Sequence, residues 1–220
     1  MFETRSDYVA FEKVLAQSLA RFPAVRLCAY CVMPNHFHLV LWPRDDDSLS
    51  RFMQWLTTTH TQRWHAHRHR MGRGHLYQGR FKSFPIEQDH HFLAVCRYVE
   101  RNALRAGLSW SEDGANSRVE HWPWASLSAR ADPFRPELHA GEWPVERPTN
   151  WIECVNQAQG ESELVSIRQC IARGNPYGSP SWTEATAKVM GLESSLRPIG
   201  RPRKVEVETL PDAVRGDAGK

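Results

Sequence analysis

The 220-residue sequence predicts an α+β domain in which helices flank an antiparallel sheet, and three observations support this prediction. Apolar residues alternate on both sides of a Pro34-Asn35 step, which is typical of a β-hairpin. Apolar residues recur at helical spacing both before and after this hairpin. Two shorter helical patterns near the C-terminus indicate a small helical extension.

The first half of the predicted domain is a helix followed by the hairpin. Thr4 and Asp7 have the spacing of a capping box, and a helix is expected over about residues 7–22, ended by Pro23. Strands are expected over about 25–33 and 36–42.

The second half contains two helices with one strand between them. An acidic loop at 43–47 precedes an amphipathic pattern from Leu49 to Trp64. Residues 81–87 indicate a strand, placed near a sheet edge because it contains a proline. Asp89 is the expected N-cap of a third helix that ends at Gly107. Its expected core face consists of Phe92, Val95, Cys96, Val99 and Ala103.

The remaining residues are expected to form a connection, an extension and a tail. Trp122, Trp124 and Leu127 are expected to fold back onto the core. We expect a main domain over residues 1–130, a Trp- and Pro-rich connection over 131–160 and a helical extension over 161–204. This extension includes helices at about 162–172 and 182–190 and a basic tail. Residues 205–220 are polar and expected to be disordered.

Composition limits the class of protein. The apolar fraction of 41% is enough for a core, and no apolar run approaches the roughly 20 residues of a membrane span. The first residues do not have the pattern of a signal peptide, and the five scattered cysteines favour reduced thiols, so we expect a cytoplasmic protein. Residues 51–110 carry ten Arg or Lys against three acidic residues, a net charge of +7. This bias indicates a polyanionic partner such as nucleic acid, or simply a solvated basic face.

His36 and His38 are the first candidate metal ligands. Residues two apart in a strand point to the same side, so both imidazoles leave one surface while Phe37 points the other way. Two such imidazoles are either half of a metal site or half-buried structural histidines. Cys28 and Cys31 have the spacing of a zinc knuckle, but residues three apart in a strand face opposite sides, which argues against a shared metal. His65, His67 and His69 are assigned either to a basic surface that contacts phosphates or to a solvated loop.

Tyr98 is the candidate nucleophile and Asn102 the candidate third metal ligand. They are four residues apart on the third predicted helix, so they share a face, which we expect to lie opposite the apolar stripe. A divalent cation would stabilise charge on a phosphoryl group under attack by the phenol. The alternative is a packing tyrosine beside a surface asparagine.

Aromatic and basic side chains together indicate contacts to DNA. Residues 74–82 mix both types on a glycine-rich backbone, which suits unpaired bases and their phosphates. The alternative is a loop that closes the core with Tyr77 and Phe81. A basic segment at 197–204 is either a minor-groove contact or a solubilising tail. The candidate DNA-binding residues are His75, Tyr77, Arg80, Lys82, Arg101, Arg105, Arg201 and Arg203.

Three motifs, at residues 29–40, 74–83 and 97–108, together resemble the REP-associated tyrosine transposases of the single-tyrosine HUH superfamily. Residues 122–126 resemble the aromatic signature that follows, and residues 192–203 resemble the end of some members. The resemblance implies a ferredoxin-like antiparallel sheet flanked by helices. It implies His36 and His38 as HUH ligands, Tyr98 as nucleophile and Asn102 as a further metal ligand.

The implied reaction is cleavage and rejoining of single-stranded or hairpin DNA through a 5′-phosphotyrosine, with Mg²⁺ or Mn²⁺ as cofactor. The implied protein is a monomer or homodimer without a membrane partner. The family's first strand has no counterpart here, because the sequence opens at Met1 almost at the first helix. Three explanations for the absent strand are open: a misplaced start codon, a truncated relic, or another segment that covers the exposed edge of the sheet. A non-catalytic DNA-binding relative and a phosphoesterase that uses water instead of Tyr98 are the alternative functions.

Overall fold

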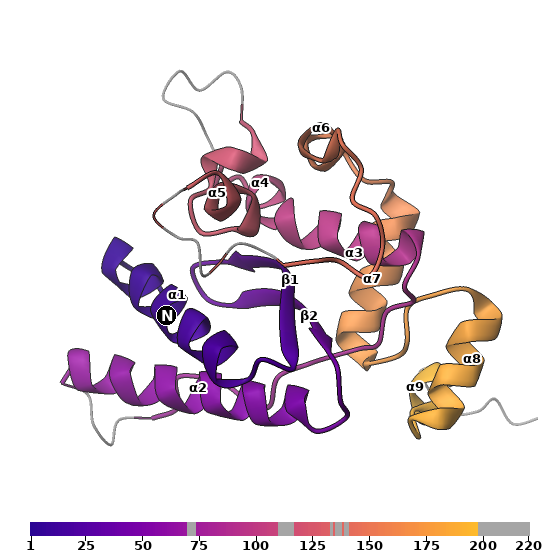
Figure 1. Ribbon diagram of the computed structural model, residues 1–220, viewed down its shortest axis with the longest axis horizontal. Coiled ribbons are helices and arrows are strands. Elements are labelled where there is room, and N and C mark those ends of the chain that lie inside the picture. The colour runs from indigo at the N-terminus through magenta and orange to yellow at the C-terminus, as the bar shows by residue number, and fades with distance from the viewer. Residues whose placement is uncertain (70–73, 110–116, 133, 135–137, 139–140, 198–220) are drawn as a thin grey trace, which may run out of the picture.

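The computed structural model describes residues 1–69, 74–109, 117–132, 134, 138 and 141–197. Helix α1 (Arg5–Arg21) leads into strands β1 (Val25–Val32) and β2 (Phe37–Pro43), followed by α2 (Ser48–His67) and α3 (His90–Glu100). The strands pair antiparallel, with α1 and α2 on one face of the hairpin and α3 on the other (Figure 1). The predicted α+β class, hairpin and first three helices are confirmed.

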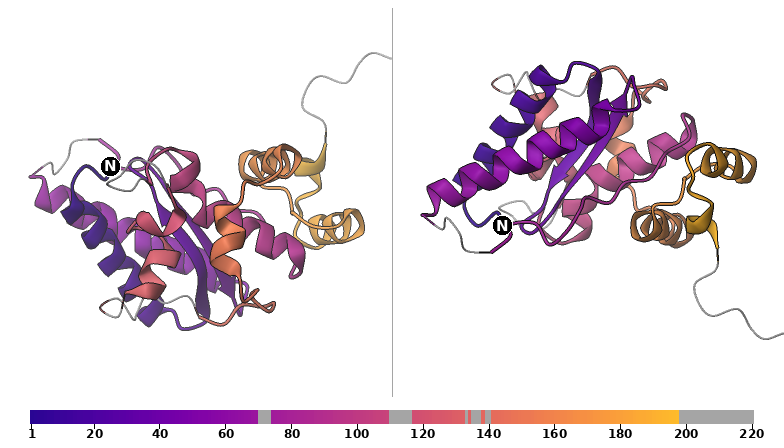
Figure 2. Two further views of the ribbon diagram at one scale, coloured as in Figure 1. Left: turned by 90° about the horizontal axis from the view of Figure 1, so that it is seen from above. Right: turned by 90° about the horizontal axis from the view of Figure 1, so that it is seen from below.

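The chain continues through a series of short elements to a helical end. These elements are α4 (Asn102–Arg105), the 3₁₀ turn η1 (Val119–His121), α5 (Ser126–Ala131), α6 (Trp151–Asn156), α7 (Glu161–Arg173), α8 (Pro180–Val189) and α9 (Glu193–Leu196). Figure 2 shows α7, α8 and α9 gathered at the opposite end of the molecule from α1. The helices expected at 162–172 and 182–190 are therefore confirmed. Within the described residues, no helix is both long and apolar enough to cross a membrane.

Strand β1 is buried on both faces and separates two apolar clusters. Leu27, Tyr30 and Val32 pack with α1 and α2, whereas Ala29 and Cys31 pack with α3. Such double burial explains why this strand is an almost continuous apolar run. The hydroxyl of Tyr30 is also satisfied, because it donates a 2.8 Å hydrogen bond to buried Glu12.

The start of α1 is held by its predicted cap. The backbone N–H and the hydroxyl of Thr4 donate to a carboxylate oxygen of Asp7, at 2.8 and 2.9 Å. Arg68, just after α2, donates to the same oxygen at 2.8 Å. The capping carboxylate therefore also ties the end of α2 to the start of α1.

The outer edge of β1 is covered by a later segment. Val32 N–H donates to the carbonyl of Trp124 at 2.8 Å, and Tyr30 N–H donates to the Ser126 hydroxyl at 3.1 Å. Trp124 and Leu127 are buried, and Trp122 donates from its indole to the Val32 carbonyl at 3.0 Å. The prediction that these residues fold back onto the core is confirmed.

The outer edge of β2 makes no backbone hydrogen bond to another described strand. The strand expected at 81–87 is wrong: this segment is extended, with a single bridge between Ile86 and Tyr177. The carbonyl of Pro85 accepts from Tyr177 N–H at 2.9 Å, and Glu87 N–H donates to the Tyr177 carbonyl at 3.0 Å. Because the segment pairs with residue 177, it leaves a space beside β2.

A buried polar network ties α3 to the segments that follow it. Glu100 is 1% exposed and accepts from the Trp151 indole at 2.6 Å and from the Ser126 hydroxyl at 2.5 Å. Arg130 forms an ion pair with the same carboxylate at 2.7 Å. These partners offset the cost of burying the charge and hold α5 and α6 against α3.

Candidate active site

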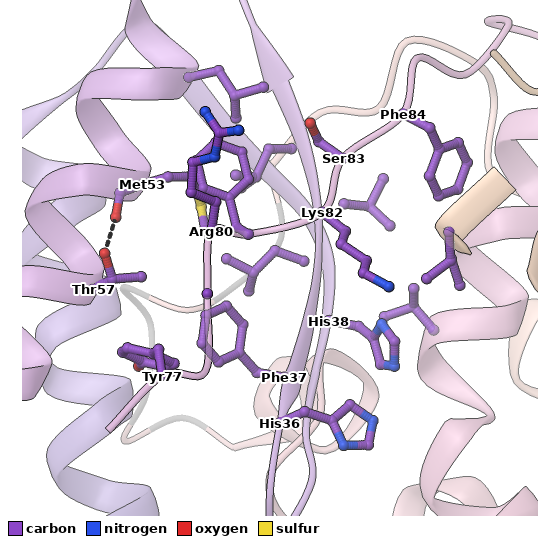
Figure 3. Close-up of a pocket in the computed structure, with 18 of the residues that line it drawn as sticks. His36, Phe37, His38, Met53, Thr57, Tyr77, Arg80, Lys82, Ser83 and Phe84 are labelled. Atoms are coloured by element: carbon purple, nitrogen blue, oxygen red, sulfur yellow. Dashed lines mark hydrogen bonds between the residues drawn. The ribbon is translucent and has the colours of Figure 1, made fainter. Parts of the chain in front are cut away.

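The space beside β2 is a cleft of about 930 Å³ that is lined by half of the predicted site residues. It lies between the outer edge of β2 and the segment that carries Arg80 and Lys82 (Figure 3). His36, His38 and Tyr98 line it together with apolar side chains, and these include Leu39, Leu41, Met53, Val95, Val99, Ile167 and Ile171.

His36 and His38 leave the same side of β2, as the strand spacing predicts. Their ring centres are 4.9 Å apart and the rings are perpendicular. Phe37 points to the other side, where its ring lies 4.8 Å from that of Phe11 (Figure 3). Burial, together with the smaller effects of the positive charges of His36 and Arg105, lowers the pKa of His38 to about 3. His38 is therefore neutral at physiological pH, which is the form that binds a metal.

Asn35 orients the first imidazole. Its side-chain oxygen lies 2.6 Å from Nδ1 of His36, and desolvation lowers the pKa of His36. An amide oxygen only accepts hydrogen bonds, so Nδ1 carries the proton and Nε2 keeps its lone pair. Two neutral imidazoles, one of them held by a neighbouring side chain, form a donor set that fits a divalent cation.

Tyr98 lies beside His38 but is more buried than expected. The two ring centres are 6.0 Å apart at 85°, and Tyr98 is 7% exposed within the cluster that packs against α3. The expectation that its face lies opposite the apolar stripe is wrong, because α3 packs against the hairpin and also against α6 and α7. The Tyr98 hydroxyl forms no hydrogen bond within the described part of the chain.

Asn102 lies one turn further on and is engaged by Arg105. Asn102 is 8% exposed, and its side-chain oxygen accepts from Nη2 of Arg105 at 2.5 Å. The guanidinium carbon of Arg105 lies 4.1 Å from the centre of the Tyr98 ring. Sequence reasoning placed Arg105 among the DNA contacts and missed this double contact. The sequence does contain a signal for this contact. Arg105 follows Asn102 by three residues and Tyr98 by seven, which places all three side chains on one helical face.

The predicted DNA-binding residues differ in their accessibility. His75, Arg80 and Lys82 are exposed. The hydroxyl of Tyr77 lies 2.6 Å from Nδ1 of buried His60, and burial raises the pKa of Tyr77.

Two further candidates are held within the protein or lie beyond the described residues. Arg101 donates to the carbonyls of Val155 and Asn156, at 3.0 and 2.5 Å. Arg201 and Arg203 lie outside the described residues.

The expectation that Cys28 and Cys31 face opposite sides of the strand is wrong. An irregularity in the pairing between Leu27 and Ala29 allows Cys28 and Cys31 to join the same apolar cluster. Burial raises the pKa of both thiols to about 12. Protonated thiols are poor metal ligands.

One possible metal-binding group was missed from the sequence. Asp89, His90 and His91, at the start of α3, have potential ligand atoms within 4.8 Å of one another. Asp89 caps the helix by accepting from the N–H of His91 at 2.8 Å, and the His91 ring lies at the same distance from that oxygen. Capping alone accounts for this geometry. The sequence signal for this group was the run of one aspartate and two histidines in consecutive positions.

Comparison with protein families finds a match that covers the predicted nucleophile and metal ligands. Residues 4–102, a little under half of the chain, match the family model described as "Transposase IS200 like". This part of the chain is similar to an IS200-like transposase domain. Searches of curated proteins and of solved structures found no significant match. The matched range contains His36, His38, Tyr98 and Asn102. Similarity to this family indicates DNA as the partner, cleavage and rejoining of DNA as the activity, and a divalent cation as the cofactor.

Proposed function

We propose that this IS200-like domain cleaves and rejoins single-stranded DNA, with Tyr98 as the nucleophile. The observation that carries the proposal is the cluster of three rings in one cleft, with centre distances of 4.9 Å between His36 and His38 and 6.0 Å between His38 and Tyr98. Two potential ligands and one potential nucleophile therefore lie within reach of a single phosphodiester.

The proposed reaction is a transesterification. The hydroxyl oxygen of Tyr98 attacks phosphorus, its proton passes to water or a general base, and the 3′-oxygen leaves as a 3′-hydroxyl. The DNA then remains attached to Tyr98 as a 5′-phosphotyrosine. Attack by a 3′-hydroxyl on this ester reforms a phosphodiester and releases Tyr98. The number of ester bonds is conserved in both steps, so no external energy source is needed.

His36, His38 and Asn102 are the proposed cation ligands. A bound Mg²⁺ or Mn²⁺ would stabilise negative charge on the phosphoryl oxygens. His38 is suited to this role because burial keeps its imidazole neutral. Asn35 fixes the proton of His36 on Nδ1, which leaves Nε2 for the metal.

Arg80 and Lys82 are the proposed contacts to the DNA backbone. Both side chains are exposed, and both line the cleft that contains Tyr98. Cations at that position attract a phosphodiester chain toward the two imidazoles. His75 lies at the start of the same segment and is exposed.

Replacing Tyr98 with phenylalanine tests the proposal. Wild-type protein with Mn²⁺ is expected to form a covalent adduct with a hairpin-forming oligonucleotide that withstands denaturing electrophoresis. Tyr98→Phe should abolish the adduct while its affinity for the oligonucleotide stays within about twofold, because only the hydroxyl is lost. Tyr77→Phe is the matched control, since it removes a phenol from the same cleft and should leave the adduct.

The possible outcomes separate the competing functions. An adduct that persists in Tyr98→Phe would contradict the assignment of the nucleophile. DNA binding without cleavage in wild-type protein would indicate a non-catalytic relative. Repeated turnover without an adduct would indicate a phosphoesterase that uses water.

A further inference from the structure

The guanidinium of Arg105 has one nitrogen engaged and another without a partner. Nη2 donates to the Asn102 side-chain oxygen at 2.5 Å, and it lies 3.4 Å from the Tyr98 carbonyl. Nη1 is buried and forms no hydrogen bond within the described residues. A buried donor without an acceptor is costly, so this nitrogen favours binding of an acceptor.

The engaged nitrogen affects the proposed metal site directly. Asn102 is the proposed third ligand, and a cationic group already occupies the region in front of its oxygen. A divalent cation approaching that oxygen would be repelled by the guanidinium at close range. In this arrangement, His36 and His38 can accept a cation, whereas Asn102 contributes little while Arg105 stays in place.

A phosphate group would satisfy the free nitrogen. Guanidinium groups bind phosphate oxygens through two parallel N–H donors, and such charge-assisted bonds are stronger than a bond to a neutral amide. The guanidinium stacks on the Tyr98 ring, so a phosphate bound to it would lie beside the proposed nucleophile. The amide oxygen of Asn102 would then be released.

We propose that Arg105 exchanges Asn102 for a DNA phosphate, so that binding of DNA and binding of the cation strengthen each other. This proposal rests on the proposed function, because it places the scissile phosphate beside Tyr98. Arg105 is then a phosphate ligand that also positions Asn102. Coupling of two binding events is reciprocal, so DNA raises the cation affinity by the factor by which the cation raises the DNA affinity.

Mn²⁺ affinity in the non-cleaving Tyr98→Phe background tests the exchange. Electron paramagnetic resonance would measure free Mn²⁺ with and without a hairpin-forming oligonucleotide. We expect DNA to raise the affinity by about fivefold or more. DNA attracts cations by itself, so the reference is the Tyr98→Phe/Asn102→Ala protein, in which the increase should be clearly smaller. Equal increases in the two proteins would overturn the proposal.

Arg105→Gln, in the same background, gives a second measurement without DNA. Removing the guanidinium should raise the Mn²⁺ affinity of the free protein several-fold and reduce its dependence on DNA. Arg168→Gln is the charge-matched control, because the charge of Arg168 is close enough to lower the pKa of Arg105 while its side chain pairs with exposed Glu161. A similar rise in both variants, or no rise in Arg105→Gln, would contradict the exchange. In the presence of Asn102→Ala, Arg105→Gln should have little further effect.

The test separates this inference from the proposed function. If wild-type protein forms the Tyr98 adduct but shows no coupling, only the exchange is wrong. If coupling through Asn102 is present but the adduct never forms, the proposed function is wrong.

Discussion

The imidazole of His38 lies 6.0 Å from the phenol ring of Tyr98, at an angle of 85°. The two residues are 60 positions apart and belong to β2 and the helix α3 that covers the hairpin. Val95 and Val99, on the same helix, line the cleft that borders β2. Packing of α3 on the hairpin therefore determines how the proposed nucleophile meets the proposed metal ligands, and the following predictions test different parts of this arrangement.

Asn35→Ala should weaken Mn²⁺ binding by about 10- to 100-fold, because His36 loses the partner that orients its ring. Titration of the purified protein with Mn²⁺ measures the effect. Asp89→Asn is the control, since asparagine keeps the helix cap but removes a carboxylate from the second possible metal group. Loss of binding in Asp89→Asn but not in Asn35→Ala would place the cation at the start of α3.

Glu100→Gln should lower the free energy of unfolding by about 3 kcal/mol or more, because Arg130 loses its buried counterion. Urea denaturation of the two proteins measures the difference. The same substitution at exposed Glu161, which pairs with Arg168, should change the free energy by about 0.5 kcal/mol or less. Similar effects at the two positions would show that burial of the Glu100 network contributes little.

The stability of the protein should fall as the pH decreases from about 6.5 toward 4, in part because of His60. Burial lowers the pKa of His60 to about 4, so the unfolded chain binds a proton on this residue before the folded protein does. Its contribution is present above pH 6.5 and is lost at up to about 1.4 kcal/mol per pH unit through this window.

The variant His60→Gln isolates this contribution. Its free energy of unfolding should be lower than that of wild type at pH 7, and the gap should narrow by pH 4.5. His75→Gln changes an exposed histidine and serves as the control. A gap that is the same at both pH values would show that His60 does not cause the loss.

Arg80→Gln and Lys82→Gln should each weaken binding of single-stranded DNA and reduce its salt dependence. Each phosphate contact that is lost should reduce the slope of log K against log salt by about 0.7. Fluorescence anisotropy at several salt concentrations gives the slope. Lys13→Gln, which removes an exposed charge on α1 outside the cleft, should leave it unchanged. An equal effect of all three substitutions would indicate nonspecific attraction.

Local patterns were sufficient to predict many parts of the fold. The alternation around Pro34-Asn35 predicted the hairpin, and it predicted that His36 and His38 share one side. The apolar spacing of the third predicted helix, which forms α3 and α4, predicted its core face. Its members Phe92, Val95, Cys96, Val99 and Ala103 are all buried. Gly107 was predicted to end this helical region, and its φ of 68° is the left-handed conformation that glycine favours there.

Contacts between distant segments could not be predicted from such patterns. The segment at 81–87 has the composition of a strand, but its backbone bonds to Tyr177 instead of the sheet. The sequence did not reveal which segment covers the exposed edge of the sheet. In the structure, residues 124–126 cover the outer edge of β1, whereas the outer edge of β2 borders the cleft. The cysteine pair was assigned to opposite faces because a pairing irregularity has no clear sequence signal.

The sequence by itself determined the hairpin, the first three helices, the side of β2 that carries both imidazoles and the similarity of residues 4–102 to IS200-like transposases, because these depend on local periodicity and motif spacing. The tertiary structure decided the environment of each site residue. It buried Tyr98, because α3 is covered by the hairpin on one side and by α6 and α7 on another. It also placed the guanidinium of Arg105 over the Tyr98 ring and within hydrogen-bond distance of the Asn102 side-chain oxygen. Desolvation and the choice among competing hydrogen-bond partners depend on all the surrounding segments, so a local pattern does not specify them.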